Sequence, residues 1–488
     1  MQTAPFIYLM EELKTQHTID FMKRFLLLVL LVSSLSSSAQ QLTLKQCIDT
    51  AVKNNILVQQ TGLQKQSAEI NLKQSKLNLL PNINGNWNYG LNFGRNVDPI
   101  TNTFTNNQLS SSNVGASADV VLFNGMRLQN LIQQNNFSYR AAEMDNKQAK
   151  DNLVLNVILA YMQVIAGEDV LEVSKAQLLV TKKQVERIDI LVKEGSLGNF
   201  QLTDIKGQMA NEEINIINLE NNLQQSKLNL YQLMNINFND AFVFQRSEIV
   251  LTDAAYTQTS AQVIAAAFEY MALVKANEYR VKSAEKNILV VKGGLYPTVS
   301  LSGAAGSSYS SLQKRFIASN SFNEVSTGAY IKNGSIRTPV FSEEPIFNSE
   351  KISYTNQLNT NLGFFTGINV QIPLFNNLQT RNRIKQAKIS FKSTQLTAEN
   401  ANYQLRQNIE QAWFNLNASF KRYNVLQQQL ANFEESFRAA TVRFESGVIN
   451  AAEFLIAKNN VDRSKINLVQ AKYEYTFRTK LMDFYQGK

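Results

Sequence analysis

Residues 79–94 read LLPNINGNWNYGLNFG, and this stretch decides the fold. After Pro81, every second residue is apolar over a run that contains Trp87, Tyr89, Leu91 and Phe93. Alternation with a period of two is typical of a strand with one apolar and one polar face. Before Pro81, over residues 44–79, apolar residues recur at helical spacing instead. Pro81 therefore marks a change from helix to strand.

The same change occurs a second time in the chain. Leu295-Tyr296-Pro297 repeats Leu79-Leu80-Pro81 after 216 residues, whereas Leu374-Phe375-Asn376-Asn377 repeats Leu122-Phe123-Asn124-Gly125 after 252. The difference of 36 residues places an insertion between Pro297 and Leu374. Constant offsets of this kind indicate an internal two-fold repeat. We expect a first structural repeat over 40–235, a linker over 236–259 and a second repeat over 260–488.

Each predicted repeat has one long helix and two shorter ones. The long helices are predicted over 126–193 and 377–445, where apolar residues step by three and four as in a coiled coil. The shorter helices are predicted over 44–79, 200–233, 262–294 and 451–486. A 68-residue helix is about 100 Å long, and two short helices stacked end to end match it. Such equal lengths favour a long antiparallel α-helical cylinder.

The strands are predicted as one pair within 84–123 and a second pair within 298–374. Each is about 9–13 residues long, which is the length of a membrane-spanning β-strand. A soluble hairpin packed on the helices stays open as an alternative, because alternation does not distinguish lipid from protein. Four strands cannot close a barrel in lipid, so a barrel requires several chains. Three chains would supply twelve strands.

The predicted fold class is therefore an α+β membrane protein. It joins a long antiparallel α-helical coiled-coil barrel to a transmembrane β-barrel of four strands per chain and twelve per trimer. The loops 95–112 and 307–360 would lie at the end of the strands away from the helices. The longer loop carries the insertion and either caps the pore or forms a variable surface loop.

The first 39 residues are predicted to be a leader and signal peptide. From Met22 the chain reads MKRFLLLVLLVSSLSSSAQ, with a basic start, an apolar run too short to span a membrane, and small residues Ser37 and Ala39. We expect cleavage after Ala39. Residues 1–21 precede this signal, so either Met1 or Met22 is the initiator. An export signal favours an extracytoplasmic protein.

The amino-acid composition excludes several kinds of catalytic and metal site. The 488 residues include one histidine, His17, and one cysteine, Cys47, which we expect to be buried. With only one residue of each type, the chain cannot form an intrachain disulfide, a Cys/His zinc site or a dyad built on a second histidine. No catalytic, cofactor-binding or metal-ligating residue is predicted. The 48 basic and 39 acidic residues are spread along the chain, so no nucleic-acid partner is expected.

The order helix, Pro, strand, loop, strand, long helix, Gly turn and short helix, written twice, resembles the TolC-type outer-membrane efflux channels. The resemblance rests on residues 42–48, both Pro–strand junctions, both Leu-Phe-Asn strand ends and two Gly-centred tips. It implies a homotrimer in outer-membrane lipid with a helical tunnel in the periplasm. It also implies docking to a periplasmic adaptor, a membrane fusion protein, and to an inner-membrane pump.

The resemblance further implies roles for residues near the tips. The periplasmic tip and adaptor contact are expected at Glu194, Gly195, Ser446 and Gly447. The gate is expected at Asp204, Arg443, Phe444, Glu445 and Glu453. Phe444 stands where a Tyr is usual, so the latch is expected to differ from the family's. A ring of three Glu453 carboxylates would bind polyvalent cations, whereas a solvated helix-end charge is the alternative.

The leading hypothesis is the exit duct of a tripartite efflux system. A type I protein-secretion exit channel and a non-transporting coiled-coil surface or structural protein remain alternatives. An exported enzyme is disfavoured, because the chain has no phosphate-binding Gly-rich loop or clustered carboxylate motif. The sequence does not identify the transported substrate.

Overall fold

A computed structural model describes residues 41–98, 100, 102–106, 108–238, 242–246 and 254–487. The predicted signal peptide, with His17 and the cleavage site after Ala39, lies outside these residues, as does part of the 236–259 linker. The described chain forms two compact units, each of which takes residues from both halves of the sequence. The helical unit comprises 41–64, 142–276 and 399–487, and the strand unit comprises 65–141 and 277–398.

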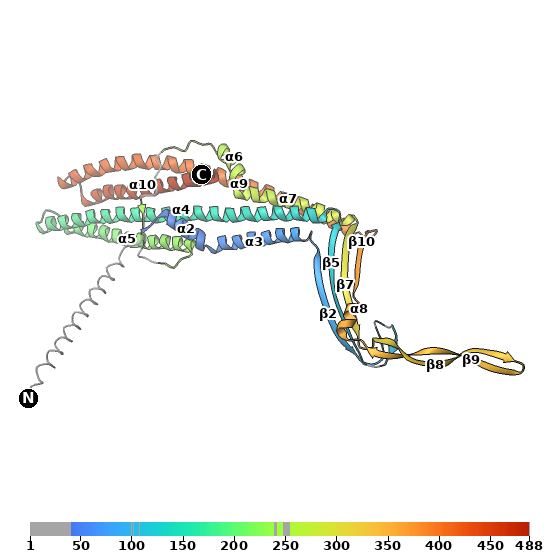
Figure 1. Ribbon diagram of the computed structural model, residues 1–488. Helices are drawn as coiled ribbons and strands as arrows, with labels where there is room; N and C mark the ends of the chain where they lie inside the picture. Colours follow the sequence, from blue (N-terminus) through green and yellow to red (C-terminus); the bar gives the residue numbers. More distant parts are fainter. Residues whose placement is uncertain are drawn as a thin grey trace, which may run out of the picture. The chain divides into compact units, whose positions relative to one another are not determined.

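Long helices dominate the chain (Figure 1). Helix α4 spans Arg127–Lys193 and α9 spans Gln379–Glu445, each with 67 residues. They are followed by α5, Asn199–Met234, and α10, Ala451–Tyr485. All four lie within two residues of the helices predicted from apolar spacing, so those predictions are confirmed.

The shorter helices before each proline are broken, and the prediction of uninterrupted helices over 44–79 and 262–294 is wrong. The first consists of α2, Leu44–Asn54, and α3, Ile56–Leu77. The second consists of α6, Ser260–Tyr270, and α7, Ala272–Lys292, after which a 3₁₀ turn, η2, spans Gly293–Leu295.

Single residues in extended conformation make these breaks. Asn55 has φ −65° and ψ 124°, and Met271 has φ −67° and ψ 130°. The Oδ1 atom of Asn55 accepts hydrogen bonds from the backbone N–H groups of Leu57 at 3.0 Å and Val58 at 3.3 Å. These bonds satisfy donors that the first turn of α3 leaves free, as an N-cap does. A short polar side chain thus ends one helix and starts the next.

The two halves also share their helix starts. Thr43 caps α2 and Thr259 caps α6, and each hydroxyl accepts a hydrogen bond from the backbone N–H group three residues on. The side chains of Gln46 and Gln262 accept from the backbone N–H groups of the two threonines in return. This reciprocal arrangement is the capping box, and here it recurs after the same 216 residues as the prolines.

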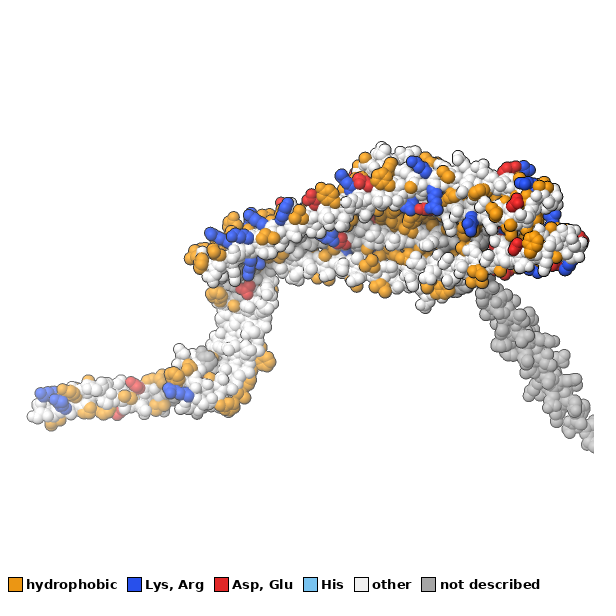
Figure 2. Space-filling view, turned by 180° about the vertical axis from the view of Figure 1, so that it is seen from behind, with side chains coloured by type: hydrophobic (Ala, Val, Ile, Leu, Met, Phe, Trp, Pro, Cys, Tyr) orange, Lys and Arg blue, Asp and Glu red, His pale blue; other side chains and the backbone are white. Residues whose placement is uncertain are grey.

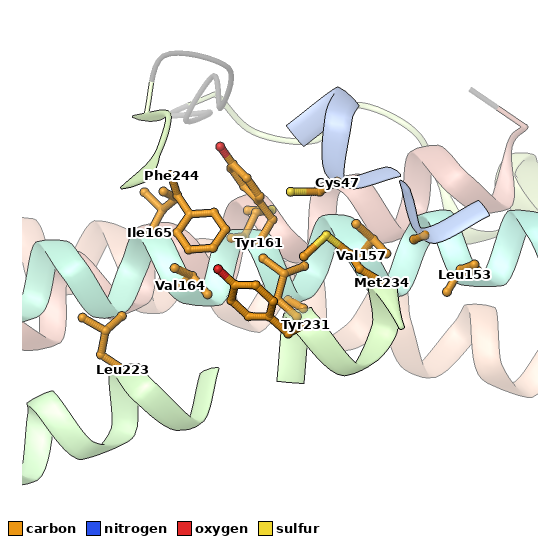
Figure 3. Close-up of a cluster of buried hydrophobic side chains, with 14 of the residues drawn as sticks. Cys47, Leu153, Val157, Tyr161, Val164, Ile165, Leu223, Tyr231, Met234 and Phe244 are labelled. Atoms are coloured by element: carbon orange, nitrogen blue, oxygen red, sulfur yellow. The ribbon is translucent and has the colours of Figure 1, made fainter. Parts of the chain in front are cut away.

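The core of the helical unit gathers around Tyr161 of α4 (Figure 3). The tyrosine is fully buried, and its hydroxyl donates toward the backbone oxygens of Leu42 at 3.1 Å and Gln245 at 2.8 Å. Leu42 ends the short strand β1 (Gln41–Leu42), and Gln245 follows the short strand β6 (Val243–Phe244). The two strands pair in parallel. The start of the described chain and the linker are therefore both fixed to the middle of α4.

Cys47 lies in the same cluster and is fully buried, as predicted. By length and composition, α4 contains a stretch apolar enough to cross a membrane. Within that helix, Leu153, Val157 and Ile165 are packed into this core. Their apolar character is accordingly explained by helix packing. A second cluster joins α6, α9 and α10 around Ile409, Leu416, Tyr475 and Met482.

The strand unit contains a four-stranded antiparallel sheet. Its strands are β2 (Asn82–Asn92), β5 (Leu109–Phe123), β7 (Thr298–Ser310) and β10 (Gly363–Gln371). The order is β10-β7-β5-β2, so β5 of the first half pairs with β7 of the second. Within the described chain, β2 and β10 each have one edge without a partner strand. The sheet is open at both sides.

The register separates two chemically different faces. One rung contains Trp87, Val114 and Ser307, and the next contains Asn86, Gly115 and Gly306. The face with Trp87, called the apolar face, carries Ile83, Tyr89, Leu91, Ala116, Val120, Val299, Leu301, Ala305, Phe364, Ile368 and Val370. The opposite face, called the polar face, carries Asn82, Asn84, Asn88, Asn113, Ser117, Ser302, Ser308, Asn369 and Gln371.

Charged side chains are scarce over the sheet and frequent along the helices (Figure 2). Gly125 lies where β5 passes into α4, with φ +67°. A Cβ atom there would lie 2.7 Å from the Gly293 carbonyl oxygen and 2.8 Å from Tyr296. The glycine of the Leu-Phe-Asn-Gly motif is therefore required by both its conformation and this close contact.

The predicted loops contain regular structure, which corrects the sequence interpretation. Residues 95–112 include a small hairpin of β3 (Asn96–Val97) and β4 (Phe104–Thr105), and β5 already begins at Leu109. The predicted loop 307–360 includes β8 (Lys314–Asn333), β9 (Ile336–Lys351) and helix α8 (Tyr354–Thr360). Strands β8 and β9 form a hairpin across a two-residue turn at Gly334, whose φ is +63°. Short turns of this kind match strand twist.

Candidate functional site

Two tight turns end the long helices of the helical unit. Gly195 follows α4 with φ +74°, and Gly447 follows α9 with φ +72°. Behind them, the N–H group of Ser196 donates to the Leu191 carbonyl at 2.9 Å, and that of Val448 donates to the Arg443 carbonyl at 2.8 Å. Both turns are therefore Schellman C-caps, in which glycine takes the left-handed position. We call these two turns the tips.

An apolar cluster lies directly behind the tips. Ile188 of α4 and Leu202 and Ile205 of α5 are buried, and Phe444 of α9 and Leu455 of α10 pack against them. The ring of Phe444 also stacks on that of Phe454, with 4.9 Å between centroids. Phe444, a predicted gate residue, therefore joins the two helical hairpins within one chain.

One ion pair crosses between the hairpins at the same level. The Nη1 atom of Arg187 lies 2.7 Å from Oε1 of Glu445, and both side chains are about half exposed, at 45% and 44%. Glu445 was expected at the gate, but sequence reasoning missed Arg187. Spacing along one helix does not reveal a partner on another, and no short motif surrounds Arg187.

A pocket of about 520 Å³ opens between the tips. Its lining combines apolar side chains with the ion pair, and it includes Arg187, Leu191, Leu197, Phe444, Glu445, Val448, Ile449 and Glu453. Val448 is 65% exposed at the pocket. The tips thus present a concave, partly apolar surface with a few polar groups, which is the usual character of a binding site.

The chain matches the model of one protein family over most of its length. The family is the outer membrane efflux proteins, matched over residues 47–235 and 263–479. The chain belongs to this family. It is therefore an outer-membrane protein, and its family is one of efflux proteins rather than of enzymes.

Curated relatives of this efflux protein include two TolC proteins. Outer membrane protein TolC of Vibrio cholerae is 21% identical over 446 residues, which are 91% of this chain and 90% of the relative. Outer membrane protein TolC of Escherichia coli is 21% identical over 392 residues, 74% of this chain and 71% of the relative.

Solved structures share the fold. CusC superposes with a TM-score of 0.72 at 15% identity, over 91% of each chain. VceC of Vibrio cholerae superposes with a TM-score of 0.70 at 14% identity, over 91% of this chain and 94% of that one. At such low identity these structures support the fold of the efflux protein and leave its residue roles to its own geometry.

Three predicted tip or gate residues of the efflux protein lie on its surface. Glu194, Asp204 and Arg443 are all exposed, and none of them takes part in the ion pair between Arg187 and Glu445. The Ser446 hydroxyl, in contrast, donates to the Val442 carbonyl at 2.9 Å. The structure brings Phe444 and Glu445 together with the α4–α5 hairpin, while Asp204 and Arg443 stay in solvent.

Glu453 lies in the first turn of α10, where the helix is capped by Asn450. The backbone N–H group of Glu453 donates to Asn450 Oδ1 at 2.9 Å, and Asn450 Nδ2 donates to Glu453 Oε1 at 3.3 Å. A carboxylate at a helix N-terminus is favoured by the exposed N–H groups there. Within one chain, the geometry therefore accounts for Glu453 as a helix-end charge.

A buried charged cluster joins the hairpins farther from the tips. Lys458 of α10 is only 2% exposed, and its Nζ atom lies 2.9 Å from Glu212 Oε1 and 2.5 Å from Asp462 Oδ2. Glu212 also accepts hydrogen bonds from Thr181 at 2.7 Å and Gln208 at 3.0 Å. Burial raises the pKa of Asp462 despite the nearby ammonium. We call these groups the Lys458 cluster.

Glu212 is an acidic residue within the apolar spacing of the helix predicted over 200–233. Its partners lie on α4 and α10, about 30 and 250 positions away, so no local pattern points to them. Among the described residues, no group of three or more His, Cys, Asp or Glu side chains is arranged to hold a metal ion.

Proposed function

We propose that three copies of this protein form a channel that serves as the exit duct of a tripartite efflux system. One observation carries the proposal: a four-stranded sheet with two unpartnered edges separates an apolar face from a polar one. An open sheet edge is not tolerated in lipid, so β2 of one copy must pair with β10 of the next. Three copies close a barrel of twelve strands.

The chemistry of the faces sets their orientation in this barrel. The apolar face meets lipid, and the polar face lines a water-filled lumen. Trp87 and Tyr89 are more than half exposed in the single chain, which suits contact with the membrane–water interface. The tips then lie at the periplasmic end of a helical tunnel.

The tips are the proposed contact with a periplasmic adaptor, which links the duct to an inner-membrane pump. The pocket between them offers apolar side chains, such as Val448, beside the half-exposed ion pair of Arg187 and Glu445. Glu194, Gly195, Ser446 and Gly447 surround this surface. In this proposal, the pump supplies the energy for transport.

Conductance of purified trimers in a planar bilayer tests the duct. We expect discrete steps of ionic current, small while the tips are closed and larger after tip substitutions. Trimers that insert yet never conduct, even with both tips altered, would rule out the duct.

Arg187→Ala is expected to raise the open probability of the channel. A half-exposed ion pair contributes about 0.2–1 kcal/mol. Each lost pair therefore shifts the equilibrium toward the open state roughly 1.4- to 5-fold, and each trimer has three such pairs. Single-channel recording measures this. Lys193→Ala is the matched control, since it breaks a pair with Asp189 within α4 alone. An equal effect of both substitutions would contradict a link between the hairpins.

Glu453→Gln is expected to weaken block by polyvalent cations. If three carboxylates form a ring, losing their charge should reduce trivalent-cation affinity about tenfold, equivalent to about 1.4 kcal/mol. Titration of the current with a trivalent cation measures the affinity. Glu435→Gln, at an exposed position on α9 paired with Arg438, is the control. Unchanged block in Glu453→Gln would leave this carboxylate a helix-end charge only.

A further inference from the structure

The β8–β9 hairpin exposes aromatic and aliphatic side chains along its whole length. Phe316 is 67% exposed and Ile336 is 71% exposed, and Phe322, Phe341 and Phe347 are more than half exposed. Its strands pair only with each other among the described residues, and the hairpin extends away from the end of the sheet (Figure 1). A two-stranded hairpin with uncovered apolar groups is marginal in water, so another surface must cover it.

Helix α8, which follows β9, shows on which side of the sheet the chain returns. The Tyr354 hydroxyl lies 3.1 Å from the Ser112 hydroxyl, and its ring lies 4.9 Å from that of Tyr309. The Ser307 hydroxyl donates to the Leu358 carbonyl at 2.6 Å. Ser112, Ser307 and Tyr309 all belong to the apolar face by register. The return segment therefore lies on the apolar face.

Gln357 fixes α8 to the edge of the sheet just beyond β10. This side chain is 1% exposed, and it accepts from the backbone N–H group of Ser310 at 2.9 Å and donates to the Ser310 carbonyl at 3.0 Å. It thus pairs with β7 as a neighbouring strand would. Asn361 continues the contact by donating to the Ser308 carbonyl at 2.8 Å. Because of these bonds, the base of the hairpin is held to one side of the sheet.

Three aromatic side chains lie close together where the hairpin leaves the sheet. The Trp87 indole donates to the Ser112 hydroxyl at 3.1 Å, which brings Trp87, Tyr309 and Tyr354 together at this end of the apolar face. Trp and Tyr rings with their polar groups satisfied are typical of the membrane–water interface. In the proposed barrel, the hairpin therefore emerges at the level of the lipid headgroups.

Two rungs of the hairpin place like charges directly opposite each other. Lys314 faces Lys351 near the base, and Lys332 faces Arg337 near the turn. Like charges across a rung are unfavourable in an isolated hairpin, and a bound anion removes the repulsion. Each basic rung has an aromatic neighbour on the same face. Phe316 follows the first, and Tyr330 lies beside the second with the Arg337 guanidinium 4.5 Å from its ring centroid.

The hairpin is not basic throughout. Between the two basic rungs, Glu324 faces Glu343. Contact with anions is therefore confined to the two ends, where basic and aromatic side chains share a face. Basic groups beside exposed aromatic rings are the composition by which proteins lie on a phosphate-bearing lipid surface.

We propose that the β8–β9 hairpin lies beside the barrel and binds anionic, phosphate-bearing headgroups of the outer leaflet through its two basic and aromatic ends. It does not cover the pore. The orientation rests on the proposed function, because the apolar face must face lipid. Two observations identify lipid as the binding partner of the hairpin. Helix α8 connects the hairpin to the apolar face, and the two basic rungs supply positive charge for the headgroups.

Site-directed fluorescence on the full-length protein tests the proposal. The native Cys47 is fully buried, so thiol labelling reports introduced cysteines. Phe316→Cys and Ile336→Cys carry an environment-sensitive fluorophore, in nanodiscs of phosphatidylcholine with one quarter phosphatidylglycerol or of phosphatidylcholine alone. We expect quenching by a headgroup-attached nitroxide to be at least threefold stronger with phosphatidylglycerol. Quenching by aqueous iodide should fall correspondingly.

Charge variants give the matched control. Replacing Lys314, Lys351, Lys332 and Arg337 by Ser should abolish the dependence on phosphatidylglycerol, whereas Glu324→Gln with Glu343→Gln should leave it. Equal iodide quenching in both lipids would overturn the proposal. So would protection from both quenchers, which would indicate a protein cover.

Conductance separates this proposal from the duct itself. Joining residues 313 and 352 by two glycines removes the hairpin, and we expect the single-channel current to stay unchanged. A larger current would mean that the hairpin covers the pore. If the protein never conducts but its quenching still depends on the lipid, the result would contradict the proposed duct and support the lipid contact.

Discussion

Lys458→Met is expected to lower the free energy of unfolding by about 3–5 kcal/mol. The ammonium of this 2% exposed residue neutralises Glu212 and Asp462, which lie 2.9 and 2.5 Å away. Removing one partner of a buried ion cluster leaves uncompensated charge in a medium of low dielectric. The remaining contacts of Glu212, to Thr181 and Gln208, are neutral and do not replace the lost charge.

Denaturant unfolding of the purified protein, followed by helical circular dichroism, measures this loss. Lys465→Met is the matched control on the same helix, because Lys465 pairs with Glu434 with both side chains about half exposed. Its expected cost is below about 1 kcal/mol. Adding Glu212→Gln and Asp462→Asn to Lys458→Met should recover most of the stability, since no buried charge then remains. Similar losses for Lys458→Met and Lys465→Met would contradict this account.

The Lys458→Met variant should also regain stability in acid. Burial already raises the pKa of Asp462, and loss of the ammonium removes a contact that lowers it. A carboxyl whose pKa is higher in the folded protein binds its proton more tightly there than in the unfolded chain. Lowering the pH through that window therefore favours folding. We expect the stability gap between wild type and variant to narrow as the pH falls from 8 to 5.

Ile368→Arg is expected to prevent assembly in the outer membrane, whereas Asn369→Arg is tolerated. These neighbours on β10 lie on opposite faces, with Ile368 on the apolar face and 69% exposed in the single chain. Arginine facing lipid near the bilayer midplane costs about 2–4 kcal/mol, and each trimer would carry three. Arginine facing a water-filled lumen pays no such desolvation cost.

Heat-resistant trimer in purified outer membranes, quantified on a gel, measures assembly. We expect a loss of at least tenfold for Ile368→Arg and less than twofold for Asn369→Arg. The same pair of substitutions also tests the soluble-hairpin alternative. If helices covered the apolar face instead of lipid, both variants would remain in the aqueous fraction.

The long helices and the four strands could be predicted from sequence because their signals are local and repeated. Apolar spacing over 67 residues fixes α4 and α9 to within two residues, and alternation fixes β2 and β10. The breaks at Asn55 and Met271 were missed, since one extended residue barely disturbs a helical period. The β8–β9 hairpin was missed because its two register shifts interrupt the alternation.

The tips were predictable in part. Gly195 and Gly447 follow long helices, and a left-handed cap is the expected use of glycine there. The ion pair of Arg187 with Glu445 and that of Lys458 with Glu212 were not predictable, because each joins two helices whose paired residues lie some 250 positions apart in the sequence. Which charges meet depends on the rotation of each helix about its axis, and single-sequence spacing does not fix that rotation.

The polar face of the sheet has a consequence for what the duct can discriminate. Among all residues of β2, β5, β7 and β10, Asp119 is the only charged one. The face otherwise consists mainly of Asn, Ser and Gly, whose amides, hydroxyls and backbone exchange hydrogen bonds with water. Apart from Asp119, which each copy contributes once, this face is uncharged, and it has few side chains long enough to bind a solute. In the proposed channel, the membrane segment would therefore discriminate little between solutes, and selection would fall to groups that the solute meets before it reaches the sheet.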